Sequence, residues 1–135
     1  MSGSFRIDDS RWPIAVITVE GTLADAEVDA YVEAGTALLA RGEPYVVVID
    51  LRAMSSVSAY ARARNTQWAA AHREQLQRSC RGSVFVITSP LLRFVTMTAL
   101  LLAPLPMPYA VRRDLDEALV WAEVQHAARG TPRPT

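Results

Sequence analysis

The sequence predicts a single α/β domain with a mixed, mostly parallel sheet of about five strands and about four helices. Apolar, β-branched runs of strand length alternate along the chain with segments of helical periodicity. The first two strand-like runs are separated by a short turn, so the sheet begins antiparallel. The 135 residues suit one domain, and no linker or repeat divides them. We expect the domain to span residues 1–128, with residues 129–135 as a frayed tail.

The first half of the chain is predicted to contain a hairpin, a helix and a central strand. The strands are expected at 5–9 and 14–21, with "SRWP" as the turn between them. Thr22 stands where a helix N-cap belongs, and Arg41-Gly42 followed by Pro44 is a helix stop. The run "YVVVIDL" at 45–51 is apolar on both faces, which is typical of a central strand covered by helices on each side.

The second half repeats the alternation of helix and strand. A helix is predicted over roughly 58–79, a buried strand over 82–89, and an apolar helix within 90–106. A short edge strand at 109–113 follows, and Asp114 then caps a last helix. Right-handed crossovers between these strands make the later part of the sheet parallel.

Composition and motif content argue against several functional classes. A net charge of zero gives no electrostatic case for binding nucleic acid or an anionic membrane. One cysteine, Cys80, excludes an intramolecular disulfide, and two histidines without spaced partners do not predict a zinc site. We therefore expect no cofactor and no metal. The N-terminal stretch lacks the basic-then-apolar pattern of a signal peptide, so a cytoplasmic protein is expected.

The sequence carries no common catalytic signature, and an enzyme is not expected. A nucleophile needs a base within reach, and His72 and His126 are the obvious candidates. His72 lies on the apolar stripe of its helix, between Trp68 and Leu76, which favours a half-buried histidine bonded to a neighbouring group. His126 lies near the end of the last helix and is expected to be solvated.

The segment after the central strand is the candidate functional site. In open α/β sheets, ligands bind beyond the carboxyl ends of the strands. Polar residues there could present a partner-binding surface or a phosphorylatable hydroxyl: Asp50, Arg52, Ser55, Ser56 and Ser58. The alternative is that Asp50 only ends a strand and one serine caps the next helix.

The hairpin, the first helix, "VVVIDLRAMSSVSA" leading into a helix, and "GSVFVIT" together resemble the STAS domain family. These are small α/β modules of anti-sigma-factor antagonists and anion-transporter tails. The bacterial group described as SpoIIAA-like or STAS/SEC14-like is more similar still. Its recurring "PLP" and "EAxxW" patterns are matched by residues 104–106 and 117–121, and the resemblance covers about residues 5–125. It implies a non-enzymatic regulatory or interaction module that binds a partner protein.

One difference from the family concerns phosphorylation. Antagonist STAS domains carry an aspartate-leucine pair at the strand end and an aspartate-serine-serine-glycine run at the next helix, where one serine is phosphorylated. Asp50-Leu51 matches the first pattern, but Ser58-Ala59-Tyr60-Ala61 corresponds to the second, so alanine stands at the phosphoacceptor position. Ser55, Ser56 or Ser58 could substitute, because a helix N-terminus favours phosphate. The resemblance supports the scaffold more than the switch.

The third predicted helix is apolar nearly all round. Between residues 91 and 102 only Arg93, Thr96 and Thr98 are polar, and the segment is too short to span a bilayer. A helix on a sheet needs one apolar stripe, so the excess must be covered by the chain itself, a second copy or an apolar ligand. Phe94, Met97 and Leu101 form the candidate patch. We expect a homodimer through this helix and "PLPMP". The alternative function is binding of a small lipid-like ligand in a pocket under the helix, as the SEC14 comparison suggests.

Overall fold

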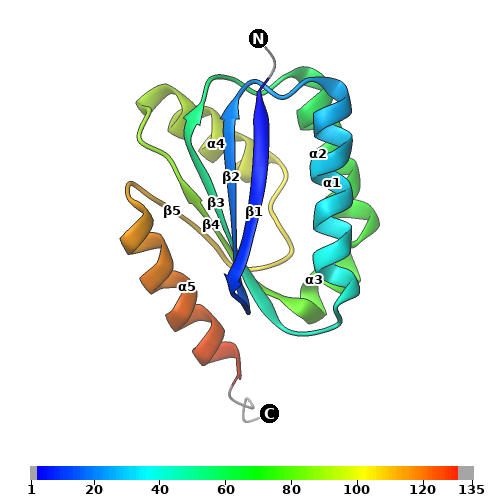
Figure 1. Cartoon of the computed structure of the whole chain (residues 1–135), viewed down its shortest axis with the longest axis vertical. Coiled ribbons are helices and arrows are strands. Elements are labelled where there is room, and N and C mark those ends of the chain that lie inside the picture. The colour runs from blue at the N-terminus through cyan, green and yellow to red at the C-terminus, as the bar shows by residue number, and fades with distance from the viewer. Residues whose placement is uncertain (1–2, 131–135) are drawn as a thin grey trace.

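A computed structural model describes residues 3–130, which form one sheet with helices on both faces (Figure 1). The five-stranded sheet has the order β1-β2-β3-β4-β5. Its strands are β1 (Ser4–Arg11), β2 (Ile14–Gly21), β3 (Tyr45–Met54), β4 (Cys80–Val86) and β5 (Tyr109–Arg112). β1 pairs antiparallel with β2, and the other neighbouring pairs are parallel. The predicted mixed sheet, with its hairpin start, is confirmed.

Within residues 3–130 the structure has five helices, one more than the approximate number expected. They are α1 (Asp25–Ala40), α2 (Ala59–Ala71), α3 (Arg73–Ser79), α4 (Pro90–Leu102) and α5 (Leu115–Gly130). The extra helix arises because the segment predicted as one helix over 58–79 breaks at His72, whose backbone leaves the helical region (φ −111°, ψ 21°). α5 includes residues 129 and 130, which were expected in the tail; residues 131–135 lie outside the described part of the chain.

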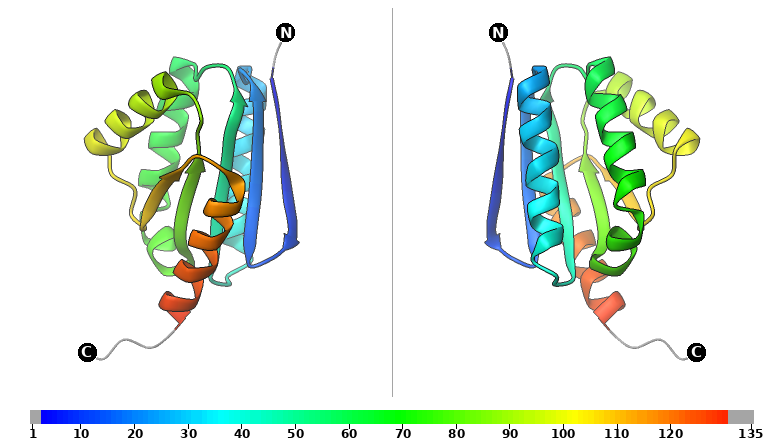
Figure 2. Two further views of the ribbon diagram at one scale, coloured as in Figure 1. Left: turned by 90° about the vertical axis from the view of Figure 1, so that its left-hand side faces the viewer. Right: turned by 90° about the vertical axis from the view of Figure 1, so that its right-hand side faces the viewer.

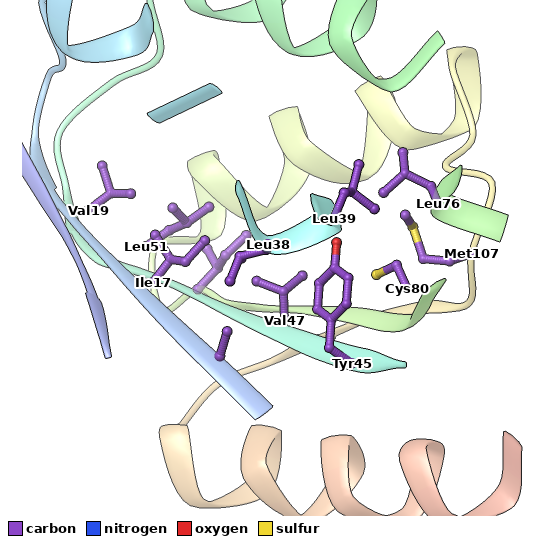
Figure 3. Close-up of a cluster of buried hydrophobic side chains, with 12 residues drawn as sticks. Ile17, Val19, Leu38, Leu39, Tyr45, Val47, Leu51, Leu76, Cys80 and Met107 are labelled. Atoms are coloured by element: carbon purple, nitrogen blue, oxygen red, sulfur yellow. The ribbon is translucent and has the colours of Figure 1, made fainter. Parts of the chain in front are cut away.

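Two clusters of buried side chains lie on opposite faces of the sheet. Because side chains alternate along a strand, Tyr45 and Val47 of β3 face α1 and α3, whereas Val46 and Val48 face α5. The cluster on the α1 side, drawn in Figure 3, gathers Leu38 and other residues of the helices around Tyr45 and Val47. This arrangement confirms β3 as a central strand covered on both faces.

Thr22 does not cap the first helix, so that prediction is wrong. α1 begins after Ala24, which provides no side-chain cap, and the acidic Asp25 and Glu27 lie in its first turn, where the helix dipole favours negative charge. The Thr22 hydroxyl instead lies 2.7 Å from the hydroxyl of Ser56. A local cap signal was therefore overridden by a contact with a segment far along the chain.

The cap predicted for the last helix is confirmed. The carboxylate of Asp114 accepts a hydrogen bond of 2.7 Å from the backbone N–H of Glu117, in the first turn of α5. The strand boundaries differ from expectation: β3 continues to Met54, and β4 begins at Cys80 and ends at Val86. Strand ends follow pairing with neighbouring strands, which local composition does not specify.

α4 projects outward from the rest of the molecule (Figure 2). Ser89 caps the helix by accepting a hydrogen bond of 3.2 Å from the N–H of Leu92. Leu92 packs against the core cluster on the α1 side, and Leu100 is buried. No helix within residues 3–130 is long and apolar enough to cross a membrane.

Candidate functional site

The carboxyl ends of the parallel strands form one edge of the sheet. The segment from Asp50 to Ser58 takes in the last residues of β3 and the turn before α2, and it crosses this edge. Asp50 lies two residues after Val48 and four after Val46, so its side chain points to the same face of the sheet as theirs, the α5 face. It pairs with Thr18 of β2 and Val86 of β4, in the middle of the sheet. Asp50 is only 6% exposed and is thus a buried acid in the second half of the central strand.

Arg52 holds the Asp50 carboxylate through three hydrogen bonds. Its guanidinium donates from Nε to Oδ1 at 2.9 Å and from Nη2 to Oδ2 at 2.8 Å, and its backbone N–H reaches Oδ1 at 3.1 Å. Two parallel charge-assisted bonds of this kind are strong and directional. They hold the pKa of Asp50 below its usual value, although burial acts in the opposite direction. The same bonds raise the pKa of Arg52.

Charged residues from elements distant in the sequence also act on this pair electrostatically. Arg6 of β1 adds a smaller electrostatic contribution that lowers the pKa of Asp50. Asp114 and Asp116, at the start of α5, add smaller contributions that raise the pKa of Arg52. Sequence reasoning missed these three residues, because only the folded protein brings β1 and α5 within electrostatic range of the Asp50–Arg52 pair.

The three serines have partners other than Asp50. Ser55 donates its backbone N–H to the carbonyl of Gly21 at 2.9 Å, and the Ser56 hydroxyl contacts Thr22. Ser58 caps α2 by accepting a hydrogen bond of 3.0 Å from the N–H of Ala61. The structure therefore brings Asp50 and Arg52 together, and it ties the serine turn to the loop between β2 and α1.

For Ser58, the local structural role considered in the sequence is present, because Ser58 caps α2. Asp50 does not end a strand, since Leu51 after it is also buried and β3 continues to Met54. Arg52 and Ser55 nevertheless remain solvent-exposed, as does Ser56. The result is a polar surface whose backbone and charged pair are fixed before any partner arrives. Such a surface is suited to recognition of another molecule.

Neither histidine belongs to this edge. His72 is half-buried and its Nδ1 lies 2.9 Å from the carbonyl oxygen of Trp68, as expected for a histidine bonded to a neighbouring group. His126 is half-buried, whereas the sequence suggested a solvated side chain. Among the described residues, no group of three or more histidine, cysteine, aspartate and glutamate side chains could hold a metal ion.

His126 lines a shallow cleft of about 400 Å³ at the opposite edge of the sheet, where the parallel strands begin. Trp12 forms part of its wall. The ring of Trp12 stacks on Tyr45 with 5.7 Å between centroids, and Arg41 lies 4.2 Å from its centroid.

The apolar patch predicted on the third helix lies on α4. Phe94, Met97 and Leu101 are all exposed, so they form an outer surface of the helix. The cleft beside Trp12 and a second one between Leu39 and Ser79 are both lined by residues outside α4. These three side chains therefore lie on the outside of α4 and line neither of these clefts.

No family model and no curated protein sequence matches the chain. Solved structures match over most of its length. An uncharacterised protein of the DUF3478 family from Shewanella loihica PV-4, described as having a SpoIIAA-like fold, is 17% identical with a TM-score of 0.67, covering 90% of this chain and 94% of that chain. An anti-sigma factor antagonist from Mycobacterium paratuberculosis is 21% identical with a TM-score of 0.58, covering 90% and 95%.

A third structure is the anti-sigma factor antagonist SpoIIAA in its unphosphorylated form. It is 13% identical with a TM-score of 0.62, and the match covers 95% of this chain and all 100% of that chain. At these identities the likeness concerns the fold. The chain therefore has a SpoIIAA-like fold, as its sequence patterns predict.

Proposed function

We propose that the chain is a non-enzymatic regulatory module of the cytoplasm that binds a partner protein through its turn surface. This surface is defined as Asp50, Arg52, Ser55, Ser56 and Ser58. The observation that carries the proposal is the fixed Asp50–Arg52 pair beside an exposed serine turn at the carboxyl edge of the sheet. Two solved structures with the same fold are anti-sigma factor antagonists, which agrees with a regulatory role.

Preorganisation supports this surface as a docking site. Binding costs less entropy when side chains are already ordered. Arg52 is oriented by the Asp50 carboxylate while its own side chain is 41% exposed, so part of the guanidinium faces solvent. The turn behind it is tied to Gly21 and Thr22. A partner with an acidic or hydrogen-bonding face would therefore contact a guanidinium group that is already held in place.

The test is a quantitative pull-down from a cytoplasmic extract with a variant carrying Arg52→Ala and Ser58→Glu. A matched control carries Arg11→Ala and Ser10→Glu, which makes the same charge changes on exposed residues at the opposite edge. We expect a partner that is retained by wild type and control and lost by the turn variant. Identical profiles for all three proteins would contradict the proposal.

Because Arg52 and Ser58 also have structural roles, a folding control is needed. Circular dichroism should show that the turn variant retains its secondary structure. A second variant, Ser55→Arg, changes an exposed side chain while keeping the Ser55 backbone contact with Gly21. Loss of the same partner in this variant would separate binding from stability.

We further propose Ser58 as the phosphoacceptor candidate of the turn surface, ahead of Ser55 and Ser56. A phosphate there would lie at the N-terminus of α2, where free N–H groups and the helix dipole favour negative charge. Phosphopeptide mapping of protein purified from its native host tests the assignment. Modification of Ser55 or Ser56 with an unmodified Ser58 would contradict it.

The alternative proposal is that α4 covers a small apolar, lipid-like ligand. The observation in its favour is the set of apolar side chains on this helix, with Phe94 69% and Leu101 78% exposed. Such a ligand would require α4 to pack differently, since these two side chains point away from the core. Native mass spectrometry followed by lipid extraction tests this. Protein that is free of any co-purifying lipid would contradict it.

A further inference from the structure

Most of the large apolar side chains of α4 face solvent. Exposure reaches 73% for Leu91, 69% for Phe94, 40% for Met97, 78% for Leu101 and 83% for Leu102. A helix of a globular protein normally turns its apolar side to the core and its polar side to water. The outer side of α4 does not follow this rule, so it is a surface that requires a partner.

The exposed residues form a continuous stripe at helical spacing. Leu91, Phe94 and Leu101 recur at intervals of three or seven residues, which places them on one side of the helix. The inner side is separate: Leu100 is buried and Leu92 packs against the core cluster on the α1 side. α4 therefore has two apolar faces, and the protein itself covers one of them.

The size of the outer stripe is close to what a stable dimer needs. Its exposed fractions correspond to an apolar area of roughly 600 Å², at the upper limit of the largest patch on a typical monomer. A standard interface takes about 800 Å² from each partner. The neighbouring exposed residues Ala103 and Pro104 enlarge the stripe towards this value.

We propose that a second copy of this chain covers the stripe, with α4 packed antiparallel against α4 in a two-fold dimer. The commonest symmetry of soluble oligomers pairs a surface with itself. The midpoint of Pro90–Leu102 is Thr96, so a two-fold axis there places Leu91 of one copy opposite Leu101 of the other. Phe94 then lies opposite Thr98, and each copy completes the apolar face of the other.

The antiparallel orientation also fits the charges. Arg93 is the only charged residue of α4. In the antiparallel pair it lies opposite Ala99 of the other copy, and the two arginines are separated by about 9 Å along the helix axis. A parallel pair would place the two Arg93 residues at the same height along the axis and align the two helix dipoles side by side, and both arrangements are unfavourable.

Charge also favours a second copy over a lipid surface. Helices that lie on membranes carry several lysine or arginine residues on their polar face, which attract anionic lipids. α4 carries one arginine, and the net charge of the chain is zero. An apolar, nearly uncharged stripe is better matched by an identical stripe.

Sedimentation equilibrium of the full chain, as a concentration series, measures the association. We expect a dimer for wild type and a dissociation constant raised roughly 100-fold or more by Leu101→Arg, because the substitution puts charge into the contact twice. Val120→Arg is the matched control. Val120 is 60% exposed on α5, which packs on the other face of the sheet, so this variant should dimerise like wild type.

A wild-type monomer at the highest soluble concentration overturns the proposal, and so does Leu101→Arg protein that is folded and still dimeric. Flotation with vesicles of anionic lipid examines the competing occupant. Monomeric wild-type protein that floats with vesicles would assign the stripe to a membrane. Far-UV circular dichroism of Leu101→Arg accompanies both measurements, and Leu91→Arg is the second variant if Leu101→Arg does not fold.

Cross-linking tests the orientation. Leu91→Cys protein is mixed with Leu101→Cys protein under mild oxidation, and wild type, which retains the buried Cys80, is the control. An antiparallel pair yields a disulfide-linked dimer in the mixture and little in either variant alone. The antiparallel arrangement would be overturned if Leu91→Cys protein alone formed a strong disulfide-linked dimer and the mixture formed no additional one.

Discussion

Arg52 lies two residues after Asp50 on β3 and binds its carboxylate in a bidentate ion pair. Nε donates to Oδ1 at 2.9 Å and Nη2 donates to Oδ2 at 2.8 Å. The acid is buried, whereas the side chain of the base is 41% exposed. A buried carboxylate needs hydrogen-bond donors, and Arg52 supplies them locally. The pair is thus a structural element of the strand end and, in our proposal, part of the partner surface.

Removing Arg52 should destabilise the protein. In Arg52→Ala the Asp50 carboxylate loses two donors, and we expect a loss of about 1–3 kcal/mol in the free energy of unfolding. Arg52→Lys should lose less stability, because the lysine ammonium keeps the positive charge, although it cannot form the two parallel hydrogen bonds of a guanidinium. Urea denaturation checks this, with Arg62→Ala on the exposed side of α2 as control. Equal stability of Arg52→Ala and Arg62→Ala would mean that water replaces the hydrogen bonds that the Asp50 carboxylate has lost.

The same pair predicts a pH dependence. The pKa of Asp50 is lowered in the folded protein, mainly by hydrogen bonds from Arg52, so the unfolded chain binds the proton more readily. The resulting stability is present above the unfolded pKa of about 3.9 and is lost as the pH falls through the folded value. Asp50→Asn should therefore be less stable than wild type near neutrality, and this difference should shrink in acid.

Thermal melts from neutral to acidic pH measure that difference. Asp29→Asn is the comparison, because the pKa of Asp29 is also lowered, by Tyr60 and Arg64, but its carboxylate is exposed. Its pH-dependent difference should be smaller. A constant gap between wild type and Asp50→Asn over the whole pH range would show that the ionised form of Asp50 is not the stabilising one.

Ser58 should contribute to stability as the N-cap of α2. Ser58→Ala removes the acceptor for the N–H of Ala61 and should cost about 1 kcal/mol. Ser58→Asp should keep the cap and most of the stability. Ser55→Ala is the control, since Ser55 contacts Gly21 through its backbone. Chemical denaturation ranks the variants, and equal loss in Ser58→Ala and Ser58→Asp would argue against capping.

Gly82 of β4 leaves room for α5. A Cβ at this position would lie 2.9 Å from Trp121 Cη2 and 2.9 Å from Gln125 Cγ. Gly82→Ala should therefore push α5 away from the sheet and cost about 1–3 kcal/mol. Adding Trp121→Phe removes part of the clashing ring and should recover some of that loss. A double variant no better than the sum of the two single variants would mean that the clash is relieved elsewhere.

Local sequence patterns predicted the fold class and most of the elements, because periodicity and turn residues act over a few neighbours. The apolar run before Asp50 became the central strand, and Asp114 capped the last helix as its position suggested. Thr22 shows where this reasoning fails. Its hydroxyl contacts Ser56, thirty-four residues away, and no local signal indicates such a partner.

The candidate site was also predicted only in part. Its residues could be listed from the sequence, but the hydrogen-bond partner of each could not. Arg52 pairs with Asp50 because alternate residues of a strand share a face, whereas Arg6 and Asp114 approach the pair only after β1 and α5 have packed.

Sequence alone likewise showed that the α4 segment is too apolar for one stripe. Only the tertiary structure decided which side was left uncovered, because Leu92 and Leu100 took the inner positions and turned Leu91, Phe94 and Leu101 towards solvent.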